Sequence, residues 1–206
     1  MVAGAARGRR LVTPPGAAVR PTTDRVREAV FNALGSLDRV VGASVLDLFA
    51  GSGAMGVEAL SRGARSAVFV DDSRPAVEAV KANLATCGLG GRARVVRAEA
   101  FAELRSGALK PVPGMPPAAA PAGPAAATPS ATFDLAVLDP PYDFDRWTEL
   151  LTQVPATTVV IESDRPVAVP DGWELVRQRA YGGTVVTIAE RTAATTDHPP
   201  EGEDQP

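Results

Sequence analysis

The sequence predicts a doubly wound α/β domain built on a mostly parallel sheet, and three observations carry this prediction. Apolar runs alternate with helical patterns from Ser44 onwards, which is typical of a parallel sheet covered by helices on both faces. A glycine-rich turn follows the first run directly, as at the ligand crevice of doubly wound sheets. The chain has 206 residues, of which 45% are hydrophobic and 22% are charged, so one globular domain with a full core is expected.

The expected elements follow from the apolar periodicity of each segment. After a threonine N-cap at Pro21-Thr22-Thr23, the apolar residues from Val26 to Leu37 recur at helical spacing. Strands are expected at residues 44–50, 66–71, 93–97, 133–138 and 157–162. Helices are expected at residues 54–62, 74–85 and 144–153, with a short one that ends near Arg105. Two strands at residues 173–181 and 184–190 flank Gly182-Gly183 and are predicted to close the sheet as a hairpin.

Three segments are expected to lie outside the sheet domain, which spans residues 40–191. Residues 1–39 form a basic N-terminal arm and a helix, and the glycines and prolines of residues 1–20 allow at most a short strand or hairpin. Residues 106–132 contain seven prolines, nine alanines and one charged residue, which predicts a disordered or polyproline-like surface insertion. The acidic tail, residues 192–206, is expected to be disordered.

The composition excludes several kinds of site. Cys87 is the only cysteine and His198 is the only histidine, so we expect no disulfide, no metal site and no histidine-based triad. No apolar run is long enough to span a membrane, and no apolar segment follows the N-terminal arginines as in a signal peptide. A cytoplasmic protein is expected, acting as a monomer.

The charge of the chain is unevenly distributed although its formal net charge is −3. Residues 1–39 hold seven arginines and three acidic residues, whereas residues 192–206 hold four acidic residues and no Lys or Arg. Clustered arginines are what phosphate contacts require, but a solvated surface explains them equally well. The candidate RNA contacts are Arg7, Arg9, Arg10, Arg20, Arg25 and Arg27.

The glycine-rich turn lies at Gly51, Ser52, Gly53 and Gly56, directly after an apolar run that contains Asp47 and Phe49. Its spacing matches G-x-G-x-x-G, which is usually interpreted as dinucleotide binding. The turn alone does not distinguish a dinucleotide from another adenosine compound.

Two acidic residues follow the next strands. Asp71 ends the second strand 20 residues after Gly51, where an acid binds the ribose of an adenosine cofactor. Glu99 follows the third strand, and it can accept a hydrogen bond from an adenine amine, with the Ala100 N–H as a second contact. It can equally cap the following helix.

The motif Asp139-Pro140-Pro141-Tyr142 ends the fourth strand beside the expected crevice. The Asp139 carboxylate and the Pro140 carbonyl can both accept hydrogen bonds from one exocyclic amine. These bonds favour a pyramidal nitrogen whose lone pair points at an electrophilic methyl group. Pro141 makes the turn rigid, and the Tyr142 ring offers a face on which a base can stack. This chemistry is of no use to a hydride-transfer enzyme.

These two motifs resemble those of the S-adenosylmethionine-dependent amino methyltransferases with a Rossmann-like fold. The segment from Arg20 to Asn32 (RPTTDRVREAVFN), the segment from Glu58 to Gly63 and the late segment from Tyr181 to Thr184 narrow the resemblance to the RsmD family. This family comprises the bacterial 16S rRNA (guanine(966)-N(2))-methyltransferases. The resemblance covers most of residues 2–190.

The resemblance implies a seven-stranded sheet with a C-terminal hairpin and a basic arm that helps to hold 16S rRNA or the 30S subunit. It implies S-adenosylmethionine in the crevice of residues 51–56, with Asp71 on the ribose. The guanine amine would lie between Asp139 and Pro140, under Tyr142. Residues 106–132 have no counterpart in the family pattern, and Glu99 stands where an Asp or Asn is expected.

Three alternatives remain open on the sequence. An N6-adenine DNA methyltransferase can share the Asp139–Tyr142 motif, although this chain is too short for a separate target-recognition domain. The glycine spacing would support an NAD(P)-dependent oxidoreductase. The N-terminal arginines would support a catalytically silent RNA-binding protein of the small subunit.

Overall fold

The computed structural model describes residues 1–15, 24–114 and 132–192 of the chain. In chain order, the elements in these ranges are α1 (Asp24–Ser36), β1 (Ser44–Leu48), α2 (Ala54–Ser61), β2 (Ser66–Asp71), α3 (Arg74–Cys87), the 3-10 helix η1 (Gly90–Arg92), β3 (Ala93–Arg97), α4 (Ala100–Ser106), β4 (Phe133–Leu138), α5 (Trp147–Gln153), β5 (Ala156–Ser163), β6 (Trp173–Tyr181) and β7 (Thr184–Arg191). None of the helices in these ranges is long and apolar enough to cross a membrane.

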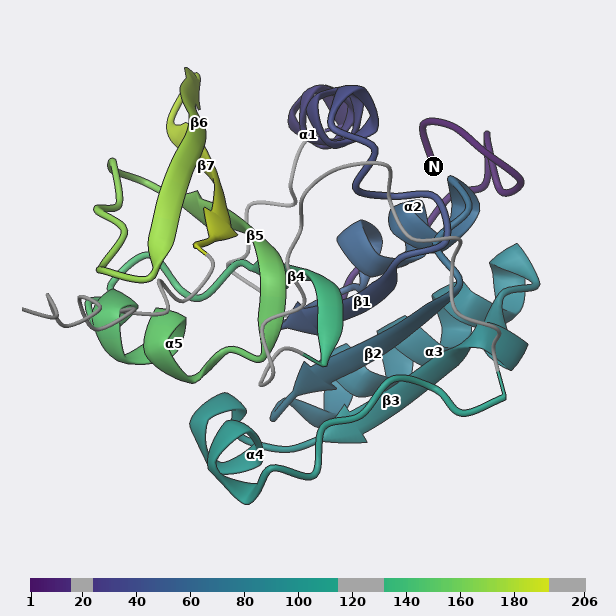
Figure 1. Cartoon of the computed structure of the whole chain (residues 1–206). Helices are drawn as coiled ribbons and strands as arrows, with labels where there is room; N and C mark the ends of the chain where they lie inside the picture. The colour runs from purple at the N-terminus through teal and green to yellow at the C-terminus, as the bar shows by residue number, and fades with distance from the viewer. Residues whose placement is uncertain (16–23, 115–131, 193–206) are drawn as a thin grey trace, which may run out of the picture.

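The strands form one seven-stranded sheet in the order β3-β2-β1-β4-β5-β7-β6 (Figure 1). Strands β1 to β5 are parallel, whereas β7 runs antiparallel to both β5 and β6. The strand order reverses between β1 and β4, and ligands of open α/β sheets bind at the carboxyl ends of the strands at such a reversal. The predicted doubly wound sheet and its C-terminal hairpin are confirmed.

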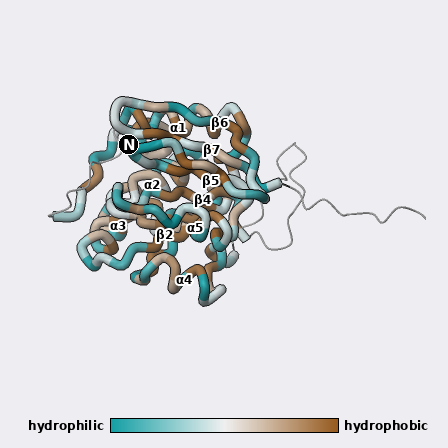
Figure 2. The backbone as a smooth tube through the Cα atoms, turned by 90° about the vertical axis from the view of Figure 1, so that its left-hand side faces the viewer, coloured by the Kyte–Doolittle hydropathy of each residue, from teal (hydrophilic) through white to brown (hydrophobic). Residues whose placement is uncertain are grey.

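Two hydrophobic cores lie on the two faces of the sheet, because successive side chains of a strand point to opposite faces. Helices α1, α2 and α3 cover the face that carries Val45 and Val137. Helices α4 and α5 cover the face that carries Leu46 and Leu138. Figure 2 shows hydrophobic residues along β4 and β5 inside these layers. Leu34 of α1 is fully buried, so α1 is a layer of the main core.

The described part of the arm, residues 1–15, contains neither a strand nor a helix, and its residues 1–9 form a closed loop. The Gly8 N–H donates to the Met1 carbonyl at 3.0 Å, and the Met1 amino group donates to the Arg9 carbonyl at 2.6 Å. Ala6 is buried and belongs to the same core as α1. This part of the arm therefore packs on the domain instead of projecting from it.

Two expected segments differ from the structure. The expected surface insertion begins too early at residue 106, because Leu109 is buried in the second core and Val112 packs against it. The rest of that insertion, residues 115–131, lies outside the described residues, as do tail residues 193–206. Helix α5 begins at Trp147 and not at residue 144, because the Phe144 N–H donates to the Pro141 carbonyl at 2.9 Å and closes a turn there.

Candidate functional site

A cavity of about 1100 Å³ opens at the carboxyl ends of the parallel strands, where the strand order reverses. Its wall combines the segments that follow β1, β2, β3 and β4 with residues of the N-terminal arm. Ligand pockets typically have volumes of about 300–1,000 Å³. The cavity therefore has room for a cofactor-sized ligand and for part of a second substrate.

The turn after β1 presents its backbone to this cavity in a left-handed conformation. Phe49 and Gly51 have φ angles of 58° and 54°. Residues other than glycine rarely adopt this region, and those that do are concentrated at functional sites. Asp47, Phe49, Gly51 and Ser52, all predicted cofactor contacts, line the cavity. These four residues therefore share one wall of the cavity.

The other two glycines of the turn serve the packing beneath it. A Cβ atom at Gly53 would lie 3.1 Å from a methyl group of Val80, and one at Gly56 would lie 2.4 Å from the Phe69 ring. The Gly56 N–H donates to Asp47 Oδ2 at 2.9 Å. Gly53, which the sequence predicts as a cofactor contact, is buried and is not among the described residues that line the cavity. Its position is explained by the close approach of this turn to Val80 of α3 and Phe69 of β2.

Asp71 ends β2 beside this turn and lines the cavity. Its Oδ2 accepts from the Gly51 N–H at 2.8 Å, and its Oδ1 accepts from the Ser73 N–H at 2.9 Å. An ionised carboxylate has about four acceptor positions. Asp71 can therefore shape the turn and still accept a hydrogen bond from a ligand hydroxyl group.

Glu99 caps helix α4, which is one of the two uses that the sequence left open. Its Oε1 accepts from the Phe101 N–H at 2.9 Å, and its Oε2 accepts from the Ala102 N–H at 2.7 Å. Such a cap satisfies backbone donors that the helix itself cannot. Glu99 and Ala100 both line the cavity, so the cap also fixes this part of its wall.

Residues Asp139 to Tyr142 follow β4 and lie beside the turn after β1, because the two strands are neighbours, with Leu48 in register with Leu138. All four residues of the motif line the cavity. Pro140 is buried, whereas Tyr142 is 47% exposed. An aromatic face is thus accessible next to the carboxyl group of Asp139.

Two sets of contacts that the sequence does not reveal hold this loop. Arg165 donates to the Phe144 carbonyl at 2.9 Å and to the Tyr142 carbonyl at 3.5 Å. The Phe144 ring packs edge-on against Phe49 and Trp147, with ring centroids 5.8 and 4.8 Å apart. Phe144 therefore links the loop to the turn after β1. No local motif marks Arg165 and Phe49 as partners of this loop, because both are distant from it in sequence.

Six acidic residues line the cavity, and three of them, Asp47, Asp71 and Asp139, lie at the carboxyl ends of β1, β2 and β4. Burial raises the pKa of Asp139 to about 7. Burial also raises the pKa of Asp47 to about 8; the hydrogen bond from Gly56 opposes this shift, and the charges of Asp139 and Asp71 add to it. A nearby cation favours the ionised form of a carboxyl group. The cavity is therefore electrostatically suited to a positively charged ligand.

The predicted RNA-contacting arginines fall into different environments. Arg9 and Arg10 are exposed and line the cavity. Arg7 and Arg25 are exposed, and neither is among the described residues that line the cavity. Arg20 lies outside the described residues. The arm thus brings two of its arginines to the mouth of the cavity.

Arg27 was expected to contact RNA from α1, but the structure buries it. Its side chain is only 5% exposed, and it pairs with Asp24 on its own helix and with Glu58 of α2, where N and O are 3.7 Å apart. It still lines the cavity, but its guanidinium is held by carboxylates, because it lies where α1 packs on α2.

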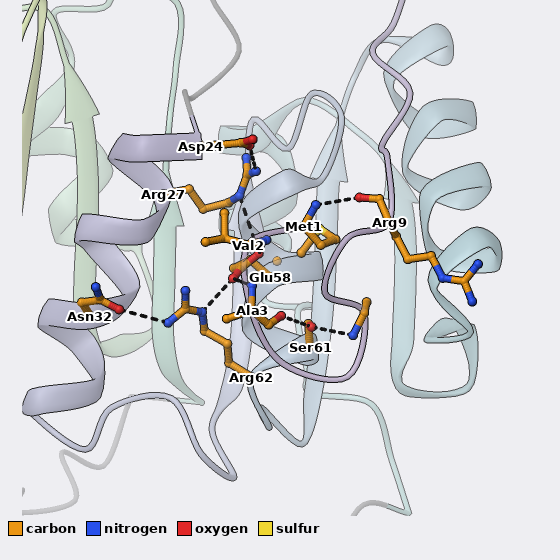
Figure 3. A network of polar contacts seen from close by, with 12 residues as sticks. Met1, Val2, Ala3, Arg9, Asp24, Arg27, Asn32, Glu58, Ser61 and Arg62 are labelled. Carbon is orange, nitrogen blue, oxygen red and sulfur yellow. Dashed lines mark hydrogen bonds and ion pairs between the residues drawn. The ribbon is translucent and has the colours of Figure 1, made fainter.

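Glu58 is a buried acid that ties the start of the arm to α2 (Figure 3). Its two carboxylate oxygens accept from the N–H groups of Val2 and Ala3, each at 3.0 Å, and Arg62 donates to it at 2.7 Å. Its side chain has no exposed surface. The sequence offered one signal for it, a charged residue within an otherwise apolar helix. No group of three or more potential metal ligands occurs within the described ranges.

Comparisons with known proteins agree with this geometry. The family model described as "Conserved hypothetical protein 95" matches residues 1–112. "Putative rRNA methyltransferase YlbH" of Bacillus subtilis (strain 168) is 35% identical over 201 residues, which is 93% of this chain and 98% of that protein. "Ribosomal RNA small subunit methyltransferase D" of Escherichia coli (strain K12) is 46% identical over 104 residues, which is 50% of this chain and 51% of that protein. The solved structure "Putative methyltransferase yhhF" from Escherichia coli has a TM-score of 0.71 at 32% identity, over 94% of this chain and 97% of that one.

Proposed function

This chain belongs to the RsmD family of ribosomal RNA methyltransferases, and from that premise we propose that it transfers a methyl group from S-adenosylmethionine to the N2 amine of a guanine in 16S rRNA. One observation carries the proposal. The turn at Gly51 and Ser52 and the acceptor pair Asp139 and Pro140 line a single cavity. Direct transfer requires a methyl donor and an amine to be held together in this way.

The residues of the cavity fit this cofactor. S-adenosylmethionine carries positive charge on its sulfonium and its α-ammonium group and one negative charge on its carboxylate, so its net charge is positive. Six acidic residues line the cavity, and two of them, Asp47 and Asp139, have raised pKa values. The turn at Gly51 and Ser52 would hold its amino-acid chain, Asp71 the ribose, and the segment at Glu99 and Ala100 the adenine. A dinucleotide would instead place an anionic pyrophosphate among these carboxylates, which argues against an oxidoreductase.

The chain's own residues would orient the target amine. The Asp139 carboxylate and the Pro140 carbonyl accept its two hydrogens and direct its lone pair into the cavity, while the Tyr142 ring stacks on the base. When bound, the cofactor supplies the electrophilic methyl group. Because the cavity admits a single base and not a duplex, the target guanine must be unpaired or flipped out of its helix.

The partner in this proposal is 16S rRNA, as the naked RNA or within the 30S subunit or one of its assembly intermediates. Arg9 and Arg10 at the mouth of the cavity would contact its phosphates. Arg7 and Arg25, which are exposed, are further candidates for phosphate contacts. Phosphate contacts of this kind supply affinity without base specificity. We also propose that the protein acts as a monomer in the cytoplasm and needs no metal ion.

The substitution Asp139→Ala tests the role of the acceptor pair. We expect it to abolish transfer of tritium from labelled cofactor to 16S rRNA, while binding of S-adenosylhomocysteine, the demethylated cofactor, is largely kept. Asp143→Ala is the matched control, because Asp143 is an exposed acid of the same loop that is not among the described residues lining the cavity. It should retain transfer.

The product identifies the reaction. N2-methylguanosine in digested 16S rRNA is the expected nucleoside, whereas N6-methyladenine in DNA would indicate the adenine methyltransferase. Binding of NAD(H) without binding of S-adenosylhomocysteine would contradict the proposal and favour the oxidoreductase. Background transfer in the wild type and in Asp139→Ala alike would indicate an RNA-binding protein without catalysis.

A further inference from the structure

We propose that Asn83 is a positioning residue that couples the N-terminal arm to the cofactor turn, so that cofactor and RNA strengthen the binding of one another. This inference rests on the proposed function, since it concerns the same cavity. Nothing in the glycine turn or in the Asp139–Tyr142 motif requires such a coupling.

The hydrogen bonds of Asn83 go to backbone groups of two separate segments. Asn83 lies on α3 and is 1% exposed. Its Oδ1 accepts from the Val12 N–H at 2.8 Å, and its Nδ2 donates to the Val12 carbonyl at 2.9 Å. The same Nδ2 donates to the Ser52 carbonyl at 2.8 Å. Both amide hydrogens and the amide oxygen are thus used, and one buried side chain joins two segments that are 40 residues apart in sequence.

Both segments belong to the wall of the cavity. Val12 lies between Leu11 and Thr13, which line the cavity together with Arg10, and Ser52 lines it from the turn after β1. Asn83 itself is not among the described residues that line the cavity. It therefore acts through the segments that it joins, behind the surface that a ligand would touch.

The start of the arm is held differently. Ser61 of α2 accepts from the Ala6 N–H at 2.9 Å and donates to the Ala3 carbonyl at 2.6 Å (Figure 3). Together with Glu58, Ser61 anchors residues 2–6 to α2, and both of these Ser61 hydrogen bonds stay within the start of the arm. The arm thus has an anchor at its start and a link to the cofactor turn at Val12.

Coupling follows from this arrangement. A cofactor that orders the turn fixes the Ser52 carbonyl and, through Asn83, the backbone at Val12 beside the arginines at the cavity mouth. RNA then meets an arm that is already ordered and loses less conformational entropy on binding. The effect is reciprocal, because coupling between two binding sites is equal in both directions.

The first experiment measures the affinity for 16S rRNA with and without saturating S-adenosylhomocysteine. We expect the cofactor product to tighten RNA binding by about fivefold or more in the wild type. Asn83→Leu keeps the approximate side-chain size but removes all three hydrogen bonds, and it should reduce this ratio to about one. Ser61→Ala is the matched control: it should weaken RNA binding in both states and keep the ratio. A ratio of one in the wild type, or an unchanged ratio in Asn83→Leu, would overturn the proposal.

The second experiment uses hydrogen exchange on the wild type and does not depend on a variant that folds. S-adenosylhomocysteine should protect the amides of residues 10–13 together with those of the turn at residues 49–53. Protection of the turn alone would overturn the coupling and leave the proposed function intact. If S-adenosylhomocysteine does not bind and protects neither segment, the proposed function itself fails.

Discussion

Raising the pH from 6 to 8 is expected to increase kcat/KM for the cofactor about tenfold, because the ionised carboxylate of Asp139 is a stronger acceptor for the amine hydrogen than the neutral carboxyl group is. Burial raises the pKa of Asp139 to about 7. With this pKa, roughly one tenth of the carboxyl groups are ionised at pH 6 and roughly nine tenths at pH 8. An ordinary aspartate would be ionised throughout this range, and the rate would not change.

The assay follows tritium transfer to 16S rRNA at saturating RNA while the cofactor concentration is varied. Under these conditions kcat/KM reports the pKa of the enzyme before the cofactor binds. At saturating cofactor, kcat should reach half its maximum at a lower pH, because a nearby positive charge favours the carboxylate. The two profiles should therefore be displaced from one another, with that of kcat on the acid side.

Two variants test the cause of the shift. Asp47→Asn replaces an acid whose own pKa lies above that of Asp139, so Asp47 is mostly uncharged while Asp139 ionises, and the midpoint of kcat/KM should stay near pH 7. Asp72→Asn changes an exposed acid that also lines the cavity and should leave the midpoint in place. A flat profile between pH 6 and 8 in the wild type would refute the reasoning, and so would a midpoint that either variant moves, because burial would then not be the cause of the shift.

Three further outcomes follow from other parts of the molecule. Replacing the three arm arginines at positions 7, 9 and 10 by alanine should weaken RNA binding and flatten its salt dependence by about one unit of slope for each phosphate that the arm no longer neutralises; an unchanged slope would exclude phosphate binding by the arm. Gly56→Ala should lower the free energy of unfolding by about 1–3 kcal/mol in urea titrations, because the added methyl group would overlap the Phe69 ring. Glu99→Ala should lower it by about 1 kcal/mol through loss of the α4 cap, and no change would show that the cap is dispensable.

Periodicity and turn chemistry predicted the sheet well, because β1, β2, β4 and β5 are buried on both faces and helices α3 and α4 begin and end at local signals. Helix α3 is an example: Ser73 caps its start, and Gly88 ends it in a left-handed conformation. The same local signals placed the turn at Gly51 and the motif at Asp139, both at strand ends. Parallel strands then bring these ends together at one edge of the sheet.

What the sequence did not predict depends on contacts between distant segments. An apolar residue within a Pro/Ala-rich segment gives no sign of its packing site, so Leu109 was expected at the surface. Arg27 falls off the apolar stripe of its helix, and only the position of Glu58 on α2 explains why it is buried. Asn83 is one polar residue among many until the folded chain places Val12 and Ser52 on either side of its amide.

The hydrogen-bond partners of the N–H groups in the glycine turn help to distinguish the two ligands that its spacing allows, a dinucleotide and S-adenosylmethionine. A pyrophosphate binds at such a turn through free backbone donors at the start of a helix. Here the Gly51 N–H is bound to Asp71, the Gly56 N–H to Asp47 and the Gly53 N–H to the Ala50 carbonyl at 2.6 Å. Two of these three donors are occupied by carboxylates that also line the cavity. The three glycine N–H groups are therefore not free for a pyrophosphate, and the two acids beside them favour a ligand that carries positive charge, although the glycine letters fit either one.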